Sequence, residues 1–333
     1  MAHTMPASRR SICARASPAR CCYVAAVGLC GSDLHYYKDG GIGAATIRAP
    51  FVPGHEFGGT LAEELPALGL ARGTLVAVDP NKACGHCDWC HEGHFNLCPQ
   101  VQFIGAPPFD GAMTARLWVP VSQIVRLPPQ LTPLDAVMLE PLGVAIHAVD
   151  LARPRLLERV ALLGAGPIGL LILQVLKVAG AGEVGVIEPQ AHRRELARRL
   201  GAAAVGETVA EIAGWSDGKG FSLVVEATNT PLGFRDAVLS ARIGGRIVLV
   251  GIPDGDQYTL PAADARRRAL KIKFSRRMGE VYPRAINLVA SGRVDVTSLV
   301  SHRVGLAATP GAFRDLADNA PGYVKVLIYP NGQ

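Results

Sequence analysis

The sequence predicts an α/β protein with two domains, one rich in β-strands and one built on a doubly wound parallel sheet. The chain has 333 residues, and single hydrophobic cores stop growing at about 250–300 residues. Residues 23–131 contain short apolar runs broken by glycine and proline, which is typical of strands joined by turns. Residues 159–253 alternate strand-like and helix-like apolar patterns, which predicts βαβ units.

The elements can be placed in order along the chain. In the β-rich part the clearest strands are expected at 74–80 and 115–128. A helix is expected at 133–152, because its apolar stripe has helical period and Pro133 suits a first turn. The later elements are a strand, glycine turn and helix at 159–181, a strand at 183–189, a helix at 190–202, strands at 221–229 and 244–253, a helix at 282–294, and strands at 300–306 and 323–330.

The charge distribution gives no support for nucleic-acid binding. The net charge is +6, and residues 1–32 contain four arginines (Arg9, Arg10, Arg15 and Arg20) and no acidic residue. Without these arginines the net charge falls to +2, so no basic surface is expected elsewhere. An arginine-rich, acid-free segment has the composition of an organellar transit peptide, but a poorly ordered or mis-specified start is the interpretation that we favour. No run of 18 apolar residues occurs, so no membrane span is expected.

Four cysteines predict a structural metal site. Cys84, Cys87, Cys90 and Cys98 follow the pattern C-x2-C-x2-C-x7-C. Thiols three residues apart can bind one ion from a tight turn, and four thiolates in tetrahedral geometry make a closed zinc site. An iron–sulfur cluster uses similar spacing and is the alternative. Thiols that bind metal must stay reduced, which indicates a cytoplasmic location.

A glycine motif predicts a dinucleotide site. Gly164, Gly166 and Gly169 form G-x-G-x-x-G directly after an apolar strand and at the start of a helix. The first glycine permits the tight turn, the second lets a pyrophosphate approach the backbone, and the third lets the helix pack on the strand. The free N–H groups at the helix N-terminus then face the phosphates. Because strand, turn and helix coincide, the motif indicates dinucleotide binding.

An acidic residue at the end of the next strand favours NAD over NADP. Glu188 lies nineteen residues beyond Gly169, where a carboxylate accepts hydrogen bonds from the ribose hydroxyls of NAD and repels a 2′-phosphate. Arg193 and Arg194 lie nearby and could instead bind a 2′-phosphate, so NADP remains the alternative.

A second metal site is expected near the N-terminus. Cys30, His55 and Glu56 lie within one short region, in "VGLCGSDLHYYKDGGIG" and "PGHEFGG". A thiolate, an imidazole and a carboxylate are good zinc ligands, and three protein ligands plus water is the pattern of catalytic zinc.

These motifs, together with "LEPLGVAIHA" and "RRMGEVYPRAI", occur in one order from Val24 to about Pro330. In this the chain resembles the zinc-dependent medium-chain dehydrogenases, specifically the polyol branch of sorbitol, xylitol and L-idonate dehydrogenases. The resemblance implies a GroES-like catalytic domain in residues 1–142 and 279–333, with a structural-zinc lobe at 80–100. It implies a Rossmann NAD-binding domain in residues 143–278. Residues 1–22 do not share the resemblance, which puts the integrity of the catalytic domain in question.

The resemblance also implies roles for individual residues. Cys30, His55 and Glu56 look like ligands of catalytic zinc, and Glu140 looks like the carboxylate that reaches the metal or its water. The alcohol-dehydrogenase branch has a cysteine ligand there, and no cysteine occurs after Cys98. The other implied roles are a proton relay through Ser32 and His35, polyol contacts by Tyr36, Glu140 and Arg277, and NAD contacts by Ile168, Glu188, Arg193, Val250, Gly251 and Ile252.

Ser32 has a structural alternative as the N-cap of a helix over "SDLHYY". Met278 stands where the polyol branch often has an aromatic residue, which leaves the substrate open.

The activity implied is zinc-dependent hydride transfer from a polyol or related secondary alcohol to NAD, in a homodimer or homotetramer. Two alternatives remain: an enzyme similar to L-threonine 3-dehydrogenase, and a zinc- and dinucleotide-binding protein whose altered N-terminus impairs catalysis. A zinc-ribbon module that binds nucleic acid is disfavoured by the near-neutral body of the chain.

Overall fold

The computed structural model describes residues 19–255 and 257–332, and the predicted α/β class with two domains is confirmed. Two compact units divide the chain. The first comprises Met1–Glu140, His302–Ala320 and Lys325–Gln333, and the second comprises Pro141–Ser301 and Pro321–Val324.

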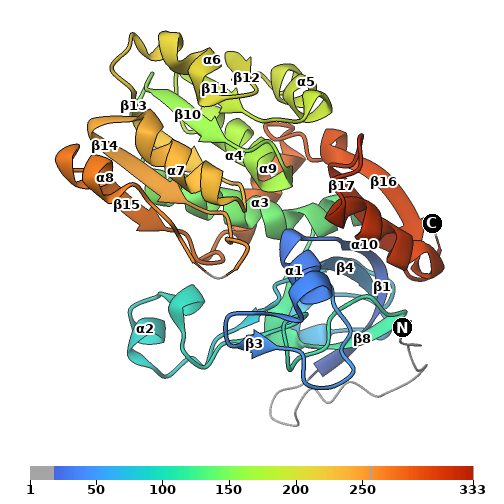
Figure 1. Ribbon diagram of the computed structural model, residues 1–333. Helices are drawn as coiled ribbons and strands as arrows, with labels where there is room; N and C mark the ends of the chain where they lie inside the picture. The colour runs from blue at the N-terminus through green and yellow to red at the C-terminus, as the bar shows by residue number, and fades with distance from the viewer. Residues whose placement is uncertain (1–18, 256, 333) are drawn as a thin grey trace. The chain divides into compact units, whose positions relative to one another are not determined.

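The first unit is built on a seven-stranded, mostly antiparallel sheet (Figure 1). Its strands follow the order β16-β17-β1-β4-β5-β9, and β8 also pairs with β1. The helices and strands of this part are β1 (Ala19–Gly28), α1 (Gly31–Asp39), β2 (Gly41–Ile42), β3 (Ala45–Thr46), β4 (Glu56–Leu61), β5 (Leu75–Val78), β6 (Asn81–Lys82), α2 (Asp88–His91), β7 (Gln102–Phe103), β8 (Arg116–Pro120), β9 (Ile124–Arg126), β16 (Val300–Gly305), α10 (Thr309–Ala317) and β17 (Lys325–Tyr329).

Strand β1 begins within residues 1–22, the segment that does not share the family resemblance. Residues 19–22 belong to β1, and its first half pairs with β8 from Ala19, opposite Pro120, to Tyr23, opposite Arg116. Cys22 is fully buried there. The remainder of the unusual segment, residues 1–18, lies outside the described residues.

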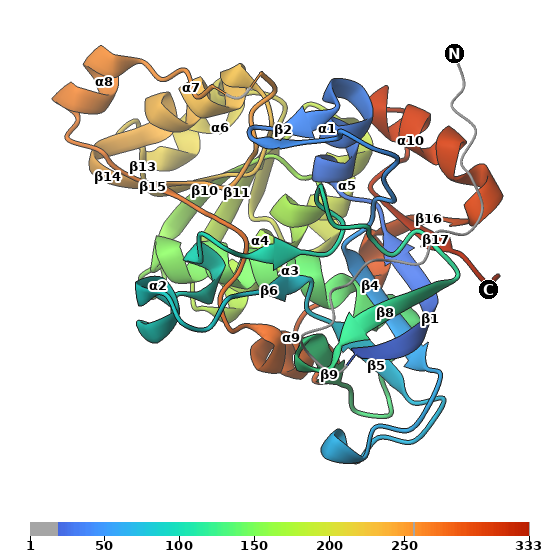
Figure 2. The same cartoon turned by 90° about the horizontal axis from the view of Figure 1, so that it is seen from below.

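The second unit is built on a six-stranded parallel sheet in the order β12-β11-β10-β13-β14-β15. Strand β10 has β11 on one side and β13 on the other, so the chain reverses its direction of sheet growth there. Figure 2 shows α3 and α4 on one face of this sheet and α6 and α7 on the other. Its elements are α3 (Pro133–Ala152), which begins in the first unit, β10 (Arg159–Leu163), α4 (Pro167–Val178), β11 (Glu183–Ile187), α5 (Ala191–Arg199), β12 (Ala204–Gly206), α6 (Val209–Ala213), β13 (Phe221–Glu226), α7 (Pro231–Ser240), β14 (Ala241–Leu249), α8 (Ala262–Arg267), β15 (Lys271–Phe274) and α9 (Tyr282–Ala290).

The expected helices and strands are present near their predicted positions, and α7 and β15 are among those that the sequence pattern did not indicate. Helix α7 has a local reason to begin where it does, because the Thr230 side chain accepts a hydrogen bond from the backbone N–H of Gly233. Its inner face buries Phe234, Ala237 and Val238 in the core against the sheet. None of the described helices is long and apolar enough to cross a membrane.

The compact units and the expected domains differ at residues 141–142 and 321–324 and, most extensively, over residues 279–301, all of which lie in the second unit. Contacts to α3 and α4 explain why residues 279–301 belong there. The guanidinium of Arg284 donates two hydrogen bonds to the carboxylate of Asp150, at 2.8 and 2.6 Å. The side chain of Gln174 exchanges two hydrogen bonds with the backbone of Asp295, at 3.0 and 2.7 Å.

Candidate functional site

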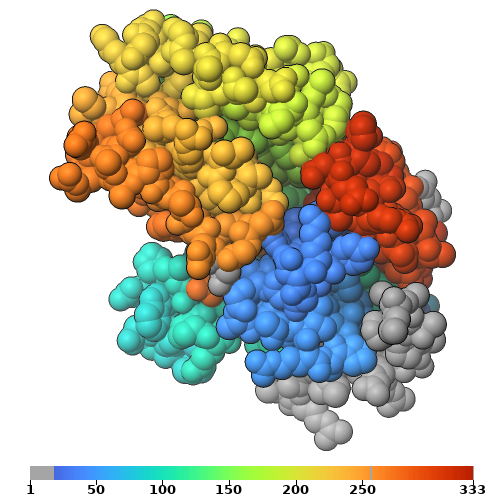
Figure 3. Space-filling view, viewed as in Figure 1, coloured from blue at the N-terminus to red at the C-terminus, as the bar shows by residue number. Residues whose placement is uncertain are grey.

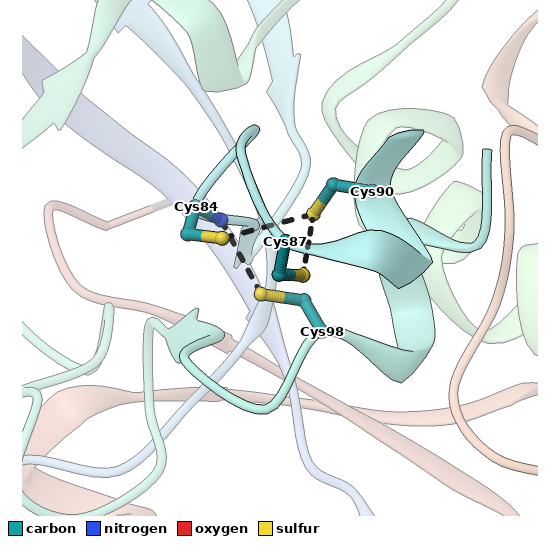
Figure 4. Close-up of side chains that lie close together, drawn as sticks. All are labelled: Cys84, Cys87, Cys90 and Cys98. Atoms are coloured by element: carbon teal, nitrogen blue, oxygen red, sulfur yellow. Dashed lines mark hydrogen bonds between the residues drawn. The ribbon is translucent and has the colours of Figure 1, made fainter. Parts of the chain in front are cut away.

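The four cysteines of the predicted structural site converge in the lobe around α2. Cys87 precedes α2, Cys90 lies within it, and Cys84 and Cys98 come from the flanking loops. The sulfurs lie within 4.8 Å of one another (Figure 4). Cys98 Sγ accepts a hydrogen bond from the Cys84 backbone N–H at 3.4 Å. Figure 3 shows this lobe in cyan as a knob at the edge of the first unit.

The chemistry of this cluster fits a metal ion. The backbone N–H of His86 lowers the pKa of the Cys84 thiol to about 6, whereas burial and the neighbouring thiols raise the pKa of Cys87 to about 12. Four sulfurs this close cannot all ionise without a cation, and a divalent ion would stabilise all four thiolates. The histidines that lie nearby, His86, His91 and His94, are exposed and stand outside this group of ligands.

Cys30, His55 and Glu56 form a second cluster, within the first unit. Cys30 is the N-cap of α1, His55 ends the loop before β4, and Glu56 is the first residue of β4. One ligand atom from each lies within 4.8 Å of the other two. His55 and Glu56 are buried. The structure thus brings together the three side chains that the spacing predicts as zinc ligands.

Asp33 organises this second cluster and was missed from the sequence. It is fully buried, and its carboxylate accepts hydrogen bonds from the backbone N–H groups of Cys30, at 3.0 Å, and Gly54, at 3.2 Å. Its Oδ1 lies 3.7 Å from Nδ1 of His55. A carboxylate beside a ligand histidine is a common arrangement at metal sites. The sequence feature that could have indicated Asp33 is "CGSD", where the aspartate lies one helical turn from Cys30.

The second cluster also fits a cation. The buried Nδ1 of His55 makes no hydrogen bond with any described residue. Burial lowers the pKa of His55, but attraction to Asp33 and Cys30 outweighs that effect and raises it well above its ordinary value. The cluster is therefore an anionic environment that favours a positive charge, which zinc would supply.

A buried lysine lies beside the cluster. Lys325 on β17 donates to the carboxylate Oε2 of Glu56 and, at 3.1 Å, to the carbonyl of Leu29. The second oxygen of Glu56 does not take part in this pair. Gly28 makes the contact possible, because a Cβ at this position would lie 2.0 Å from Glu56 Oε2. The sequence signal was a lysine inside the apolar strand "YVKVLIY".

Glu140 lies close to the cluster but is not one of its three ligand groups. It is buried on α3, and burial raises the pKa of its carboxyl to about 7, although His55 and Lys325 act to lower it. Phe103 is a further neighbour, with its ring centroid 5.4 Å from that of His55. Nothing in the sequence distinguished Phe103 from an ordinary core aromatic residue.

The other residues expected in the first unit lie on α1. Ser32 is half-buried in the first turn, and it is not the N-cap, because Cys30 takes that position. His35 is buried, and its Nδ1 lies 3.1 Å from Oδ2 of Asp39. Tyr36 is buried edge-to-face against Phe51, with ring centroids 5.7 Å apart.

The glycine motif of the second unit has the geometry that a phosphate-binding turn needs. Gly164 follows β10 with φ +93°, and a Cβ there would lie 2.7 Å from the carbonyl oxygen of Ala227. A Cβ on Gly169 would lie 2.0 Å from the carbonyl oxygen of Gly164. Gly166 differs, because nothing lies within 4 Å of its Cβ position and it is the N-cap of α4. The open space beside Gly166 is where a pyrophosphate would approach the helix.

Glu188 and the two arginines lie at the end of β11. The Glu188 carboxylate accepts hydrogen bonds from the backbone N–H groups of Ala165, at 2.8 Å, and Gln190, at 2.9 Å. Arg194 Nη1 donates to the carbonyls of Glu188 and Pro189, at 2.7 and 2.6 Å.

Arg193 is less fully bonded. Its Nη2 donates to the carbonyl of Tyr323 at 3.2 Å, but its buried Nε has no acceptor among the described residues. Burial lowers the pKa of Arg193. This geometry suits a sugar or phosphate oxygen as an additional partner.

The remaining residues expected in the second unit lie in loops and on α4. Ile168 is half-buried in the first turn of α4, and Val250, Gly251 and Ile252 directly follow β14. Arg277 is half-buried with φ +54°, in the segment after β15. Met278 is buried against α3, where a Cβ added to Gly143 would lie 2.5 Å from the Met278 Sδ.

Comparison with known proteins agrees with this combination of fold and sites. The family "Alcohol dehydrogenase GroES-like domain" matches residues 22–129, and the family "Zinc-binding dehydrogenase" matches residues 167–291. A sorbitol dehydrogenase of Bacillus subtilis is 33% identical over 314 residues, covering 92% of this chain and 89% of its own length.

Solved structures agree as well. The L-idonate 5-dehydrogenase of Escherichia coli has a TM-score of 0.86 and 29% identity, with 93% of this chain and 91% of that chain covered. A Sinorhizobium meliloti protein assigned as a zinc-binding dehydrogenase, with NADP bound, has a TM-score of 0.85 and 33% identity, with 96% and 94% covered.

A GroES-like domain joined to a parallel-sheet dinucleotide domain, with two groups of zinc-type ligands, defines a zinc-binding oxidoreductase. The chain belongs to the zinc-dependent medium-chain dehydrogenase family, in its polyol branch.

Proposed function

We propose that this protein oxidises a secondary alcohol group of a polyol, of the sorbitol, xylitol or L-idonate type, and transfers the hydride to NAD. The observation that supports this most is the buried group of Cys30, His55 and Glu56, whose ligand atoms lie within 4.8 Å. Three such ligands leave a position for substrate, whereas the four cysteines of the lobe form a closed set. The identity of 33% to a sorbitol dehydrogenase supports the substrate class.

The residues of this chain have separable roles in the proposal. Cys30, His55 and Glu56 hold the catalytic zinc, with Glu140 beside them, and the four cysteines of the lobe hold a structural zinc. When bound, zinc polarises the substrate hydroxyl as a Lewis acid, and NAD accepts the hydride. Ser32 and His35 pass the hydroxyl proton to solvent, and the hydrogen bond to Asp39 orients the imidazole of His35. Tyr36 and Arg277 contact other hydroxyl groups of the substrate.

The preference for NAD rests on Glu188. Two backbone N–H groups fix its carboxylate at the end of β11, where it faces a ribose hydroxyl favourably and a 2′-phosphate unfavourably. Arg194 is already bonded to two carbonyls, which leaves Arg193 as the arginine able to bind the cofactor. The ratio of kcat/KM for NAD to that for NADP tests this preference.

The proposed activity is tested by following NADH formation with sorbitol, xylitol, L-idonate and L-threonine. We expect turnover with at least one polyol, its loss after treatment with a chelator, and its recovery on addition of zinc. Turnover with L-threonine alone would establish the threonine-dehydrogenase alternative. No NADH from folded, zinc-loaded protein with any of these alcohols would overturn the enzymatic proposal, and a fluorescence titration with NADH would then identify a binding protein.

The cysteines also support a proposal about the cellular location of the protein. The described cysteines include no disulfide, and the thiols of both metal clusters require reducing conditions, so we place the protein in the cytoplasm.

Strand β15 ends the parallel sheet, and its Phe274 is 57% exposed. This edge suits contact with a second copy, and we expect a homodimer or homotetramer, which light scattering coupled to gel filtration measures.

A further inference from the structure

Two side chains bind the backbone of Gly251 in the loop after β14, one at its N–H and one at its carbonyl. The backbone N–H of Gly251 donates to Oε2 of Glu226 at 3.3 Å. The hydroxyl of Tyr258 donates to the carbonyl oxygen of Gly251 at 2.8 Å. One carboxylate and one phenol therefore fix the orientation of this part of the backbone.

Glu226 has no part in the chemistry proposed above, yet it is fully buried at the carboxyl end of β13. Its Oε1 accepts a hydrogen bond from the backbone N–H of Thr228 at 2.5 Å, and its own carbonyl accepts one from Val250 at 2.8 Å. The side chain and backbone of Glu226 thus connect the loop after β13 with the loop after β14. Burial raises the pKa of this carboxyl to about 7.

Two aromatic side chains of the second unit hold Tyr258 in place. Its ring packs edge-to-face on Phe234, with centroids 4.7 Å apart, and on Phe274, with centroids 5.1 Å apart. Phe234 is fully buried among the residues beneath α7. Packing on the buried Phe234 and on the exposed Phe274 therefore sets the direction of the Tyr258 hydroxyl, although Tyr258 itself is 39% exposed.

The two loops are also in direct contact. A Cβ on Gly251 would lie 1.5 Å from the carbonyl oxygen of Thr228, so only glycine fits at this position. Farther along the loop, the Asn229 amide donates to the carboxylate of Asp254 at 3.2 Å, and the Asp254 N–H donates to the Asn229 carbonyl at 3.1 Å. These contacts connect the β13 and β14 loops at several points along their length.

We propose that Tyr258 and Glu226 are positioning residues, which fix the Gly251 backbone so that Val250, Gly251 and Ile252 present a preformed surface to the dinucleotide. Ligands of open parallel sheets bind at the carboxyl ends of the strands, beside the point where the strand order reverses, and β13 flanks that point. Ile252 follows Gly251 and is 42% exposed, which leaves an apolar side chain available to the cofactor. The inference rests on the proposed function, because it assumes that a dinucleotide binds this edge.

The test uses Tyr258→Phe, which removes one hydroxyl and keeps the ring between Phe234 and Phe274. Loss of the hydrogen bond to the Gly251 carbonyl predicts a Kd for NADH about three- to tenfold higher, measured by fluorescence titration. The KM for NAD should rise while kcat at saturating NAD stays unchanged. Hydrogen exchange of the peptide that contains Gly251 should be faster in the protein without cofactor. Tyr23→Phe is the matched control, because Tyr23 has the same exposed fraction, 39%, and lies on β1.

Glu226→Gln provides a second variant of nearly the same shape. Its amide can accept from Thr228 but turns an NH₂ group toward the N–H of Gly251, so its Kd for NADH should rise more than that of Tyr258→Phe. The proposal requires weaker NADH binding and faster exchange in Tyr258→Phe, and the absence of either overturns it. Wild-type protein that binds no NADH would instead overturn the proposed function, so the two failures are distinguishable.

Discussion

Lys325 and Glu56 form a buried ion pair in the first unit, although 269 residues separate them along the chain. Each is only 1% exposed. Strand β1 lies between β17, which carries Lys325, and β4, which carries Glu56, and Gly28 at the end of β1 leaves room for the contact. Lys325 therefore places a positive charge beside a group that is otherwise anionic, and it binds one oxygen of Glu56.

Removal of that lysine should destabilise the metal-free protein strongly. Lys325→Met leaves the Glu56 carboxylate buried without its partner, which costs about 3–5 kcal/mol when a buried pair is broken. The effect should be smaller in the zinc-loaded protein, because the metal supplies a compensating charge. Urea unfolding with and without zinc measures both values. The exposed Lys271→Met is the control, and equal losses in the two Lys325→Met measurements would contradict the role assigned to Lys325.

Two glycines of the dinucleotide motif should respond differently to alanine. Gly164→Ala puts a methyl group 2.7 Å from the Ala227 carbonyl oxygen at φ +93°, so it should destabilise the fold by about 1–3 kcal/mol. Gly166→Ala has open space around its Cβ and should cost less stability than Gly164→Ala, because only the poorer capping by alanine at the N-cap of α4 opposes it. It should nevertheless weaken NADH binding, because the methyl group occupies the approach to the helix N-terminus. Unaltered NADH affinity in Gly166→Ala would place the cofactor phosphates elsewhere.

The contrast between these sites shows what the sequence could and could not predict. The glycine motif and the four-cysteine lobe are local, so spacing alone identified their residues. Lys325 and Phe103 become visible as neighbours of the second cluster only when distant strands and loops meet around it. Helix α7 was missed because its pattern offered no apolar stripe as clear as that of α3, and its Thr230 cap became evident only in the structure.

The four-cysteine lobe should lose its metal as a unit. Cys98→Ser replaces a buried thiolate with a weak ligand, so zinc content should fall by about one equivalent per chain, while the second cluster stays loaded. The lobe should then become sensitive to limited trypsin digestion at Lys82. His91→Ala is the control, because His91 is exposed and should leave metal content unchanged. Zinc loss in His91→Ala as well would mean that the ligand set includes histidine.

Glu226 predicts a specific pH dependence of stability. Its folded pKa is raised from 4.5 to about 7, mainly because the carboxyl is buried. Between these values the folded state binds the proton more tightly than the unfolded state, so this group favours folding at low pH. That contribution is lost as pH rises through about 7.

Glu226→Gln cannot ionise, so its stability relative to wild type should improve as the pH rises from 5 to 8. A shift of this size corresponds to about 3 kcal/mol across the window. Urea unfolding of both proteins over this range measures the difference, and Glu183→Gln at an exposed carboxyl is the control. A constant difference between Glu226→Gln and wild type would show that Glu226 is ionised throughout, held by the N–H groups of Thr228 and Gly251.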